Sequence, residues 1–121
     1  MKPADLGTDA EVIVPVVDAV DLPAKNIRAE VATYYNVRLD WMCSTRRWAA
    51  VARPRMVAMY LCRRLLAMSY PDIGRAFGRD HSTVIHAVKT IDTKSIRDDK
   101  LWRDVMNIER KLLTLAGRLQ P

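Results

Sequence analysis

The sequence is poor in the residues that mark several large classes of protein. Glycine occurs four times and cysteine twice in 121 residues, and runs that alternate apolar with polar residues are scarce. The shortage of such runs argues against a β-rich fold and favours helices. Cys43 and Cys62 lie far apart without a Cys-x-x-Cys motif. We therefore predict two small buried thiols, no disulfide framework and a cytoplasmic protein.

Membrane, secretory and catalytic signatures are also missing. The apolar run Val12–Val17 is short and is broken by Pro15, and an acidic stretch precedes it. It therefore predicts neither a secretory signal nor a membrane span. We find no paired carboxylates, no nucleophile–base set, and no Cys or carboxylate at ligand spacing from a histidine. We accordingly expect no enzyme, no metal site and no cofactor.

Positive charge, in contrast, is in excess. The net charge is +6 and the isoelectric point is about 9.7. Residues 1–24 hold one lysine against five acidic residues, a net charge of −4, so the remainder carries +10. Residues 25–79 alone hold eleven Lys or Arg against three acidic residues. This concentration favours a nucleic-acid partner over a basic surface that is merely solvated.

The chain divides into an acidic arm and one helical domain. Residues 1–23 combine four proline and glycine positions with acidic residues spaced among valines. This composition predicts a flexible or loosely docked arm, with a short partner-binding strand or peptide as the alternative. Residues 24–121 suit a single domain by length and by apolar content.

Apolar spacing predicts two helices in the first half of that domain. The first covers about residues 24–36 and places Ile27, Val31 and Tyr34 on its apolar face. A short helical turn is expected over Asp40–Ser44. The second helix is expected to hold Pro54 in its first turn, where the missing N–H costs nothing, and to end near residue 68. Its predicted apolar face consists of Val57, Leu61, Leu65 and Met68.

The next segment predicts a helix-turn-helix over residues 69–94. Ser69 and Asp72 suit the start of a short helix, and Gly78 suits its end. Either Asp80 or Ser82 caps the helix that follows, over about residues 81–94. That helix has an apolar stripe and a polar face that should point outward. The stripe holds Val84, Ala87, Val88 and Ile91, and the polar face holds Ser82, His86, Lys89 and Thr93.

The last predicted helix covers about residues 99–118. Its apolar residues follow a 4-3-4-3-4 spacing: Leu101, Val105, Ile108, Leu112, Leu115 and Leu119. The stripe suits packing on its own domain, and a coiled-coil dimer is the alternative. We favour a monomer. We also interpret Tyr34, Trp41 and Trp102 as core or near-core residues.

One stretch resembles the signature of the C-terminal DNA-binding domain of DnaA-type bacterial chromosomal replication initiators, namely Gly78-Arg79-Asp80-His81-Ser82-Thr83-Val84-Ile85-His86-Ala87-Val88. Other stretches resemble further parts of that domain in the same order. They are 26–28 with 31–35, Arg46 and Arg47, 51–55, 69–74 and 76–78. The resemblance runs from about residue 24 to 116. It implies an all-α, Trp-repressor-like fold that contains a helix-turn-helix.

The resemblance also implies a set of DNA contacts. In that family the recognition helix enters the major groove and a basic loop reaches the adjacent minor groove. By matching position, base edges would be approached by Asp80, His81, Ser82 and Thr83, and the minor groove by Arg47 beside Arg46. Bases or backbone around them would be contacted by Arg55, Arg63, Tyr70 and Pro71, and phosphates by Arg53 and Lys89.

The chemistry of these residues suits such roles. A carboxylate accepts from the cytosine amino group and a threonine methyl packs on the thymine methyl. Arginine suits a narrow, electronegative minor groove, and a phosphate contact positions the protein without specifying a sequence. The alternative for Asp80 and Ser82 is a capping role alone, and for His81 and His86 a place on the surface.

Two features set this sequence apart from the initiators it resembles. Gly78 is followed directly by Arg79, where the family usually has a second glycine. A turn shortened by one residue could rotate or shift the recognition helix, so the resemblance leaves the exact target sequence open. No G-x-x-x-x-G-K-[ST] loop occurs anywhere in the chain. The resemblance therefore implies a stand-alone relative without the ATPase portion, or a domain taken from a longer protein.

We expect sequence-specific double-stranded DNA binding by a nucleoid-associated regulator or competitor at replication-initiator-type boxes. Two alternatives remain at this point. One is a protein-interaction module on a helix-turn-helix scaffold, in which the acidic arm or the last helix binds a replication or transcription factor. The other is a non-specific nucleic-acid binder whose altered turn has abolished base readout.

Overall fold

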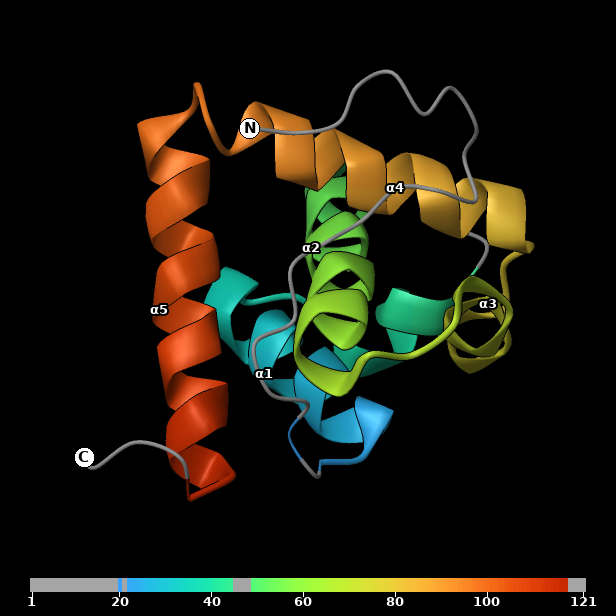
Figure 1. The fold of residues 1–121 in the computed structure, drawn as a ribbon, viewed down its shortest axis with the longest axis horizontal. Helices are drawn as coiled ribbons and strands as arrows, with labels where there is room; N and C mark the ends of the chain where they lie inside the picture. The colour runs from blue at the N-terminus through green and yellow to red at the C-terminus, as the bar shows by residue number, and fades with distance from the viewer. Residues whose placement is uncertain (1–19, 21, 45–48, 118–121) are drawn as a thin grey trace.

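A computed structural model describes residues 20, 22–44 and 49–117 (Figure 1). They form five α-helices and one 3-10 helix: α1 (Ala24–Tyr35), η3 (Leu39–Cys43), α2 (Ala49–Leu66), α3 (Tyr70–Phe77), α4 (His81–Lys94) and α5 (Asp99–Leu115). No strand occurs in these ranges, so the all-α prediction is confirmed. Within them, every helix is too short or too polar to cross a membrane.

Helix α2 lies at the centre of the domain. Helix α4 crosses it, and α3 and α5 lie on opposite sides of it (Figure 1). The predicted residues Val57, Leu61 and Leu65 are buried, and the core continues into the four other helices. The fully buried side chains there include Ile27, Phe77, Ile91, Leu101 and Leu112. The predicted apolar stripe of α4 is buried as well.

The start of α2 differs from the prediction. The helix is already formed at Ala49, and Pro54 lies inside it and is buried. Proline lacks the N–H that would bond the carbonyl four residues earlier. The turn before it contains Ala49, Ala50 and Ala52, and alanine has the highest helix propensity, which supports this turn despite the lost bond. The helix ends at Leu66 rather than Met68, because Ala67 adopts a left-handed conformation with φ of 54°.

A buried carboxylate joins α1 to α5. Asp104 is 4% exposed, and it accepts hydrogen bonds from the Tyr34 hydroxyl at 2.7 Å and the Tyr35 hydroxyl at 3.2 Å. Burial, followed by the charge of Asp104, raises the pKa of Tyr35. The Tyr34 ring is not in the core as predicted, because it is 41% exposed. The hydrogen bond from its hydroxyl to the Asp104 carboxylate holds the ring at the edge of the core.

Helix α5 packs on its own domain through most of the predicted stripe. Leu101, Val105, Ile108 and Leu112 are buried, whereas Leu115 is 56% exposed and Leu119 lies outside the described residues. The helix ends at Leu115, three residues before the predicted end, and Gly117 follows in the left-handed region. Trp102 is 51% exposed, so its interpretation as a core or near-core residue is wrong.

One further expectation is corrected in part, and another lies mostly outside the described residues. Cys62 is buried as predicted, but Cys43 is exposed, and its thiol lies 3.4 Å from the Ala76 carbonyl oxygen. Most of the predicted arm lies outside the described residues. Val20, near its end, is buried, and its N–H donates to the Leu65 carbonyl at 2.8 Å. Val20 therefore fastens the chain to the domain before α1 begins.

Candidate nucleic-acid interface

Helices α3 and α4 form the predicted helix-turn-helix. The Ser69 hydroxyl accepts from the Asp72 N–H at 3.2 Å, as predicted, and caps α3. Gly78 ends α3 in the left-handed conformation, with φ of 66°. The connection is tight, because the Arg79 N–H donates to the Gly74 carbonyl at 2.9 Å. A Cβ atom on Gly74 would lie only 2.5 Å from the Arg79 carbonyl oxygen, so only glycine allows this approach.

The N-terminus of α4 is open to solvent. His81, Ser82 and Thr83 are exposed, and the opposite face of the helix is buried. The outward positions His86, Lys89 and Thr93 are exposed too, as the apolar spacing predicts. The helix dipole gives this end a partial positive charge, which the carboxylate of Asp80 beside it offsets.

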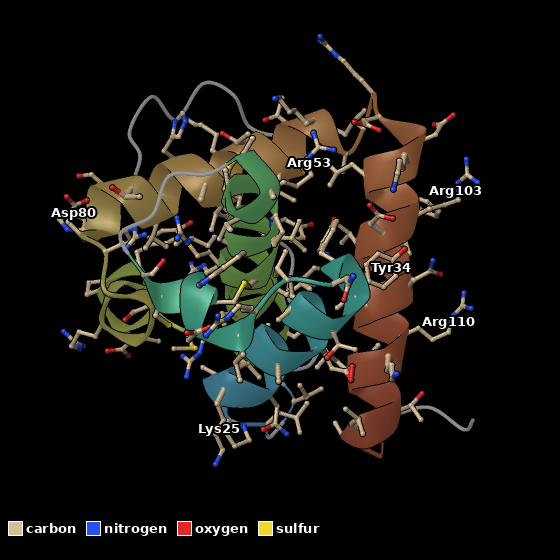
Figure 2. The ribbon with its side chains drawn as sticks, turned by 180° about the vertical axis from the view of Figure 1, so that it is seen from behind. Lys25, Tyr34, Arg53, Asp80, Arg103 and Arg110 are labelled. Carbon is tan, nitrogen blue, oxygen red and sulfur yellow. The ribbon has the colours of Figure 1, made fainter. Side chains whose placement is uncertain are left out.

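The sequence left Asp80 and Ser82 as alternative caps of α4, and the structure shows that Asp80 is the cap. Its carboxylate accepts from the Thr83 N–H at 2.9 Å. Hydrogen bonds from Thr83 lower the pKa of Asp80, so the group is ionised at neutral pH. The carboxylate lies at the surface, at one end of α4 (Figure 2). A capping role and a role in accepting from a base amino group are therefore compatible, since a carboxylate has several lone pairs.

Arg55 is buried, which the sequence did not indicate. It is 6% exposed, and it donates to the Trp41 carbonyl through Nε at 3.2 Å and through Nη2 at 2.9 Å. The same Nη2 donates to the Ser44 hydroxyl at 3.0 Å. Burial, followed by the charge of Arg79, lowers the pKa of Arg55. The guanidinium fixes the last turn of η3, from Trp41 to Ser44.

Arg63, Tyr70 and Pro71 lie together where α2 leads into α3. Arg63 donates to the Met68 carbonyl at 2.9 Å, and its guanidinium carbon lies 4.6 Å from the centroid of the Tyr70 ring. Tyr70 is buried, and burial raises the pKa of its hydroxyl. Pro71 is exposed in the first turn of α3. This corner therefore presents Pro71 and part of Arg63 to a ligand.

The expected phosphate contacts Arg53 and Lys89 lie apart. Arg53 is near the C-terminal end of α4, far from Asp80 at its start (Figure 2). Its Nη1 lies 3.7 Å from the Asp98 carboxylate. Lys89 is exposed on the outward face of α4, about two and a half turns beyond Asp80. Arg46 and Arg47, the expected minor-groove residues, lie outside the described residues.

Sequence reasoning missed two arginines that hold the helix-turn-helix in place. Arg79 donates to the Ser44 carbonyl, so Ser44 is held from both α2 and the turn before α4. Arg28 of α1 donates to the Ala76 carbonyl at 3.0 Å and lies over the Phe77 ring. Both bonds join residues far apart in sequence, and no local pattern signals them. In the described ranges no cluster of three or more His, Cys, Asp or Glu is placed to hold a metal ion.

Comparison with known proteins adds family evidence to this geometry. The family model described as the bacterial DnaA protein helix-turn-helix matches residues 24–91. The chromosomal replication initiator protein DnaA of Dechloromonas aromatica is 52% identical over 81 residues, which are 66% of this chain and 17% of that protein. The DnaA protein of Gluconobacter oxydans is 41% identical over 114 residues, which are 92% of this chain and 24% of that protein.

A solved structure agrees with the sequence comparisons. The crystal structure of a DNA replication initiation factor is similar with a TM-score of 0.69 and 34% identity, over 77% of this chain and 29% of that chain. This chain thus spans no more than about a quarter of the curated relatives named above. The matched residues include α1 to α3 and most of α4, which is the arrangement built above from its contacts. The chain therefore belongs to the bacterial DnaA helix-turn-helix family and carries its DNA-binding fold.

Proposed function

We propose that this chain binds double-stranded DNA sequence-specifically, with the start of α4 in the major groove. One observation carries the proposal: Asp80, His81, Ser82 and Thr83 are exposed together at the open end of a helix that a glycine turn fixes to α3. The N-terminal residues of a recognition helix are those that meet base edges in this kind of motif. The excess of basic residues supplies the attraction to phosphate.

Three kinds of contact follow from the placement of the side chains. Asp80 and Thr83 are suited to base edges. The Asp80 carboxylate can accept a hydrogen bond from a base amino group, and the Thr83 methyl can pack on a thymine methyl. Pro71 and the accessible part of Arg63 are suited to the backbone beside them, and Lys89 to a phosphate farther along α4. Arg46 and Arg47 are proposed for the minor groove on the basis of the family resemblance.

Arg55 has a different proposed role from the contact expected on sequence. Its guanidinium is already engaged by Trp41 and Ser44 and is nearly inaccessible. Ser44 is the last described residue before the segment that contains Arg46 and Arg47. We assign Arg55 to positioning that segment rather than to DNA itself.

The proposed target is a replication-initiator-type box, and the proposed role is a regulator of, or competitor with, an initiator at such boxes. The support is the similarity to chromosomal replication initiator proteins over most of this chain. A G-x-x-x-x-G-K-[ST] loop does not occur in the 121 residues.

Fluorescence anisotropy tests the proposal directly. The probes are a labelled duplex with an initiator-family nonamer box and a scrambled duplex of equal composition, both at about physiological ionic strength. We expect the box to bind at least about 10³-fold more tightly than the scrambled duplex. Equal binding of the two duplexes would contradict readout of the initiator-family box, and absence of binding to either would contradict the proposed DNA binding.

A further inference from the structure

One flank of α5 carries a shallow hollow of about 300 Å³. We call it the Trp102 flank, and it is lined by Trp102, Arg103, Met106, Asn107, Glu109, Arg110 and Leu113. Trp102 is 51% exposed, and Met106 and Leu113 are partly buried beside it. An exposed tryptophan with two apolar neighbours on one flank marks an interaction surface more than isolated exposure does.

The charge of the Trp102 flank is positive. Glu109 is neutralised by Arg64, whose Nε donates to it at 2.6 Å. Arg103 and Arg110 form no ion pair with any residue in the described ranges, and both point away from the rest of the domain (Figure 2). The other flank of α5 differs, because there Lys111 lies 3.9 Å from Glu30. The Trp102 flank therefore suits an occupant that is both apolar and acidic.

The sequence contains such an occupant within the same chain. Residues 1–19 hold four acidic residues against one lysine, and five of the six residues in Val12–Val17 are valine or isoleucine. Six residues in an extended conformation span about 20 Å. The helical rise from Trp102 to Leu113 is about 16 Å. The apolar run is thus long enough to cover the apolar residues of the flank.

The attachment point of this segment is linked to the flank through two successive residues of α2. Val20 is buried, and its N–H bonds the carbonyl of Leu65. The residue before Leu65 is Arg64, which bonds Glu109 in the flank itself. A short tether gives an effective concentration in the millimolar range, so a modest apolar and charge match suffices for docking. A second copy of the chain is a poorer occupant, since its own flank would bring the arginines of the two copies together.

We propose that residues 1–19 dock on the Trp102 flank, with the apolar run over Trp102, Met106 and Leu113 and the acidic residues against Arg103 and Arg110. The docked segment leaves the start of α4 uncovered, because α5 and α3 lie on opposite sides of α2 (Figure 1). The proposal concerns a surface distant from the proposed DNA contacts and does not depend on them.

Paramagnetic broadening in NMR spectra of the full-length chain tests the docking. A nitroxide is attached to the cysteine of an Ala10→Cys variant in a Cys43→Ser background, where Cys62 is buried and does not react. We expect strong loss of amide signal for residues 103–113 and little loss for residues 81–83. Arg103→Glu with Arg110→Glu should restore the α5 signals, and adding Asp9→Lys with Glu11→Lys should remove them again. Lys94→Glu with Arg97→Glu is the matched control, because both residues are exposed, and it should change nothing.

Four results would overturn the proposal. The first is full α5 signal in the spin-labelled chain, and the second is broadening centred on residues 81–83. The third is broadening that persists after the charge reversal at positions 103 and 110. The fourth appears in a mixture of spin-labelled chain without ¹⁵N and ¹⁵N-labelled chain without the nitroxide: broadening there would place the segment on a second copy.

Discussion

Arg55 Nη2 lies 3.0 Å from the Ser44 hydroxyl. This bond connects the buried face of α2 to the residue that precedes the segment with Arg46 and Arg47. Because the same guanidinium also bonds the Trp41 carbonyl, Arg55 fixes two points of one turn. A lysine has the charge of arginine but lacks its planar fork of donors. Charge and geometry at this position can therefore be separated by mutation.

We predict that Arg55→Lys weakens binding to the box nearly as much as Arg55→Ala does. Both variants lose the bonds to Trp41 and Ser44, and the free energy of unfolding should fall by about 2 kcal/mol. Arg47→Ala and Arg55→Lys should show less than additive losses of affinity, since Arg55 acts through the segment that holds Arg47. Anisotropy titrations of the two single variants and the double variant measure this. Near-normal binding by Arg55→Lys would instead indicate a phosphate contact.

Base contacts and phosphate contacts should separate at α4. Thr83→Ala is expected to cost about 1–3 kcal/mol of binding free energy on the box and much less on the scrambled duplex. Lys89→Ala should weaken both duplexes alike and lower the slope of log affinity against log salt by about 1. Both residues are exposed on α4, so neither change removes core packing. Equal losses of affinity on both duplexes for Thr83→Ala would contradict its assignment to a base edge.

Gly74→Ala is expected to damage the turn of the helix-turn-helix. The new Cβ would meet the Arg79 carbonyl oxygen at 2.5 Å, so the backbone between α3 and α4 must move. We expect a loss of about 1–3 kcal/mol in the free energy of unfolding, together with weaker binding to the box. Gly117→Ala is the control, because its φ of 75° is strained for alanine but the space around it is open. This control should lose stability without losing DNA affinity.

Stability should fall at acid pH through two helix caps. Backbone hydrogen bonds from Thr83 and Leu101 lower the pKa of Asp80 and of Asp98 respectively below the ordinary value of 3.8. A lowered folded-state pKa means stability that is complete above the unfolded-state pKa and is lost as pH falls through the folded-state value. Urea unfolding from pH 7 to pH 2 should therefore show a decline below about pH 4. Asp80→Asn with Asp98→Asn should flatten it, since asparagine caps a helix without titrating.

Asp104 should be more important for stability than any exposed acidic residue. Asp104→Ala leaves the hydroxyls of Tyr34 and Tyr35 without their acceptor, at a cost of about 1–3 kcal/mol. Asp40→Ala removes an exposed pair with Arg38 and should cost at most about 1 kcal/mol. Thermal unfolding of both variants compares them. Equal effects would show that the bonds of Asp104 to Tyr34 and Tyr35 stabilise the fold no more than an exposed ion pair does.

Local chemistry allowed much of this fold to be predicted from sequence. The roles of Ser69, Gly78 and Asp80 were predictable because a cap or a left-handed turn depends on a few neighbouring residues. Apolar spacing likewise identified the buried face of α4. Pro54 was misleading, because a proline suits the first turn of a helix yet is also tolerated where a good helix former precedes it.

The candidate site was predictable only at its exposed tip. His81, Ser82 and Thr83 are where the pattern indicated, because a helical period settles which side faces solvent. The burial of Arg55 depends on Trp41 and Ser44, which are more than ten residues away in the chain. The exposure of Trp102 similarly depends on which elements pack beside α5, and apolar spacing along one helix carries no such information.

The place of α5 sets the smallest fragment of this chain that is expected to fold by itself. The family match ends at residue 91, yet Leu101, Val105, Ile108 and Leu112 fill the side of the core next to α1. Burial of four such side chains contributes on the order of 6–12 kcal/mol, which is comparable to the whole stability of a domain of this size. A helix-turn-helix cut out at the family boundary would keep every proposed base contact and still lack a stable platform. A fusion that places this helix-turn-helix in another protein must therefore include the chain through at least Leu112.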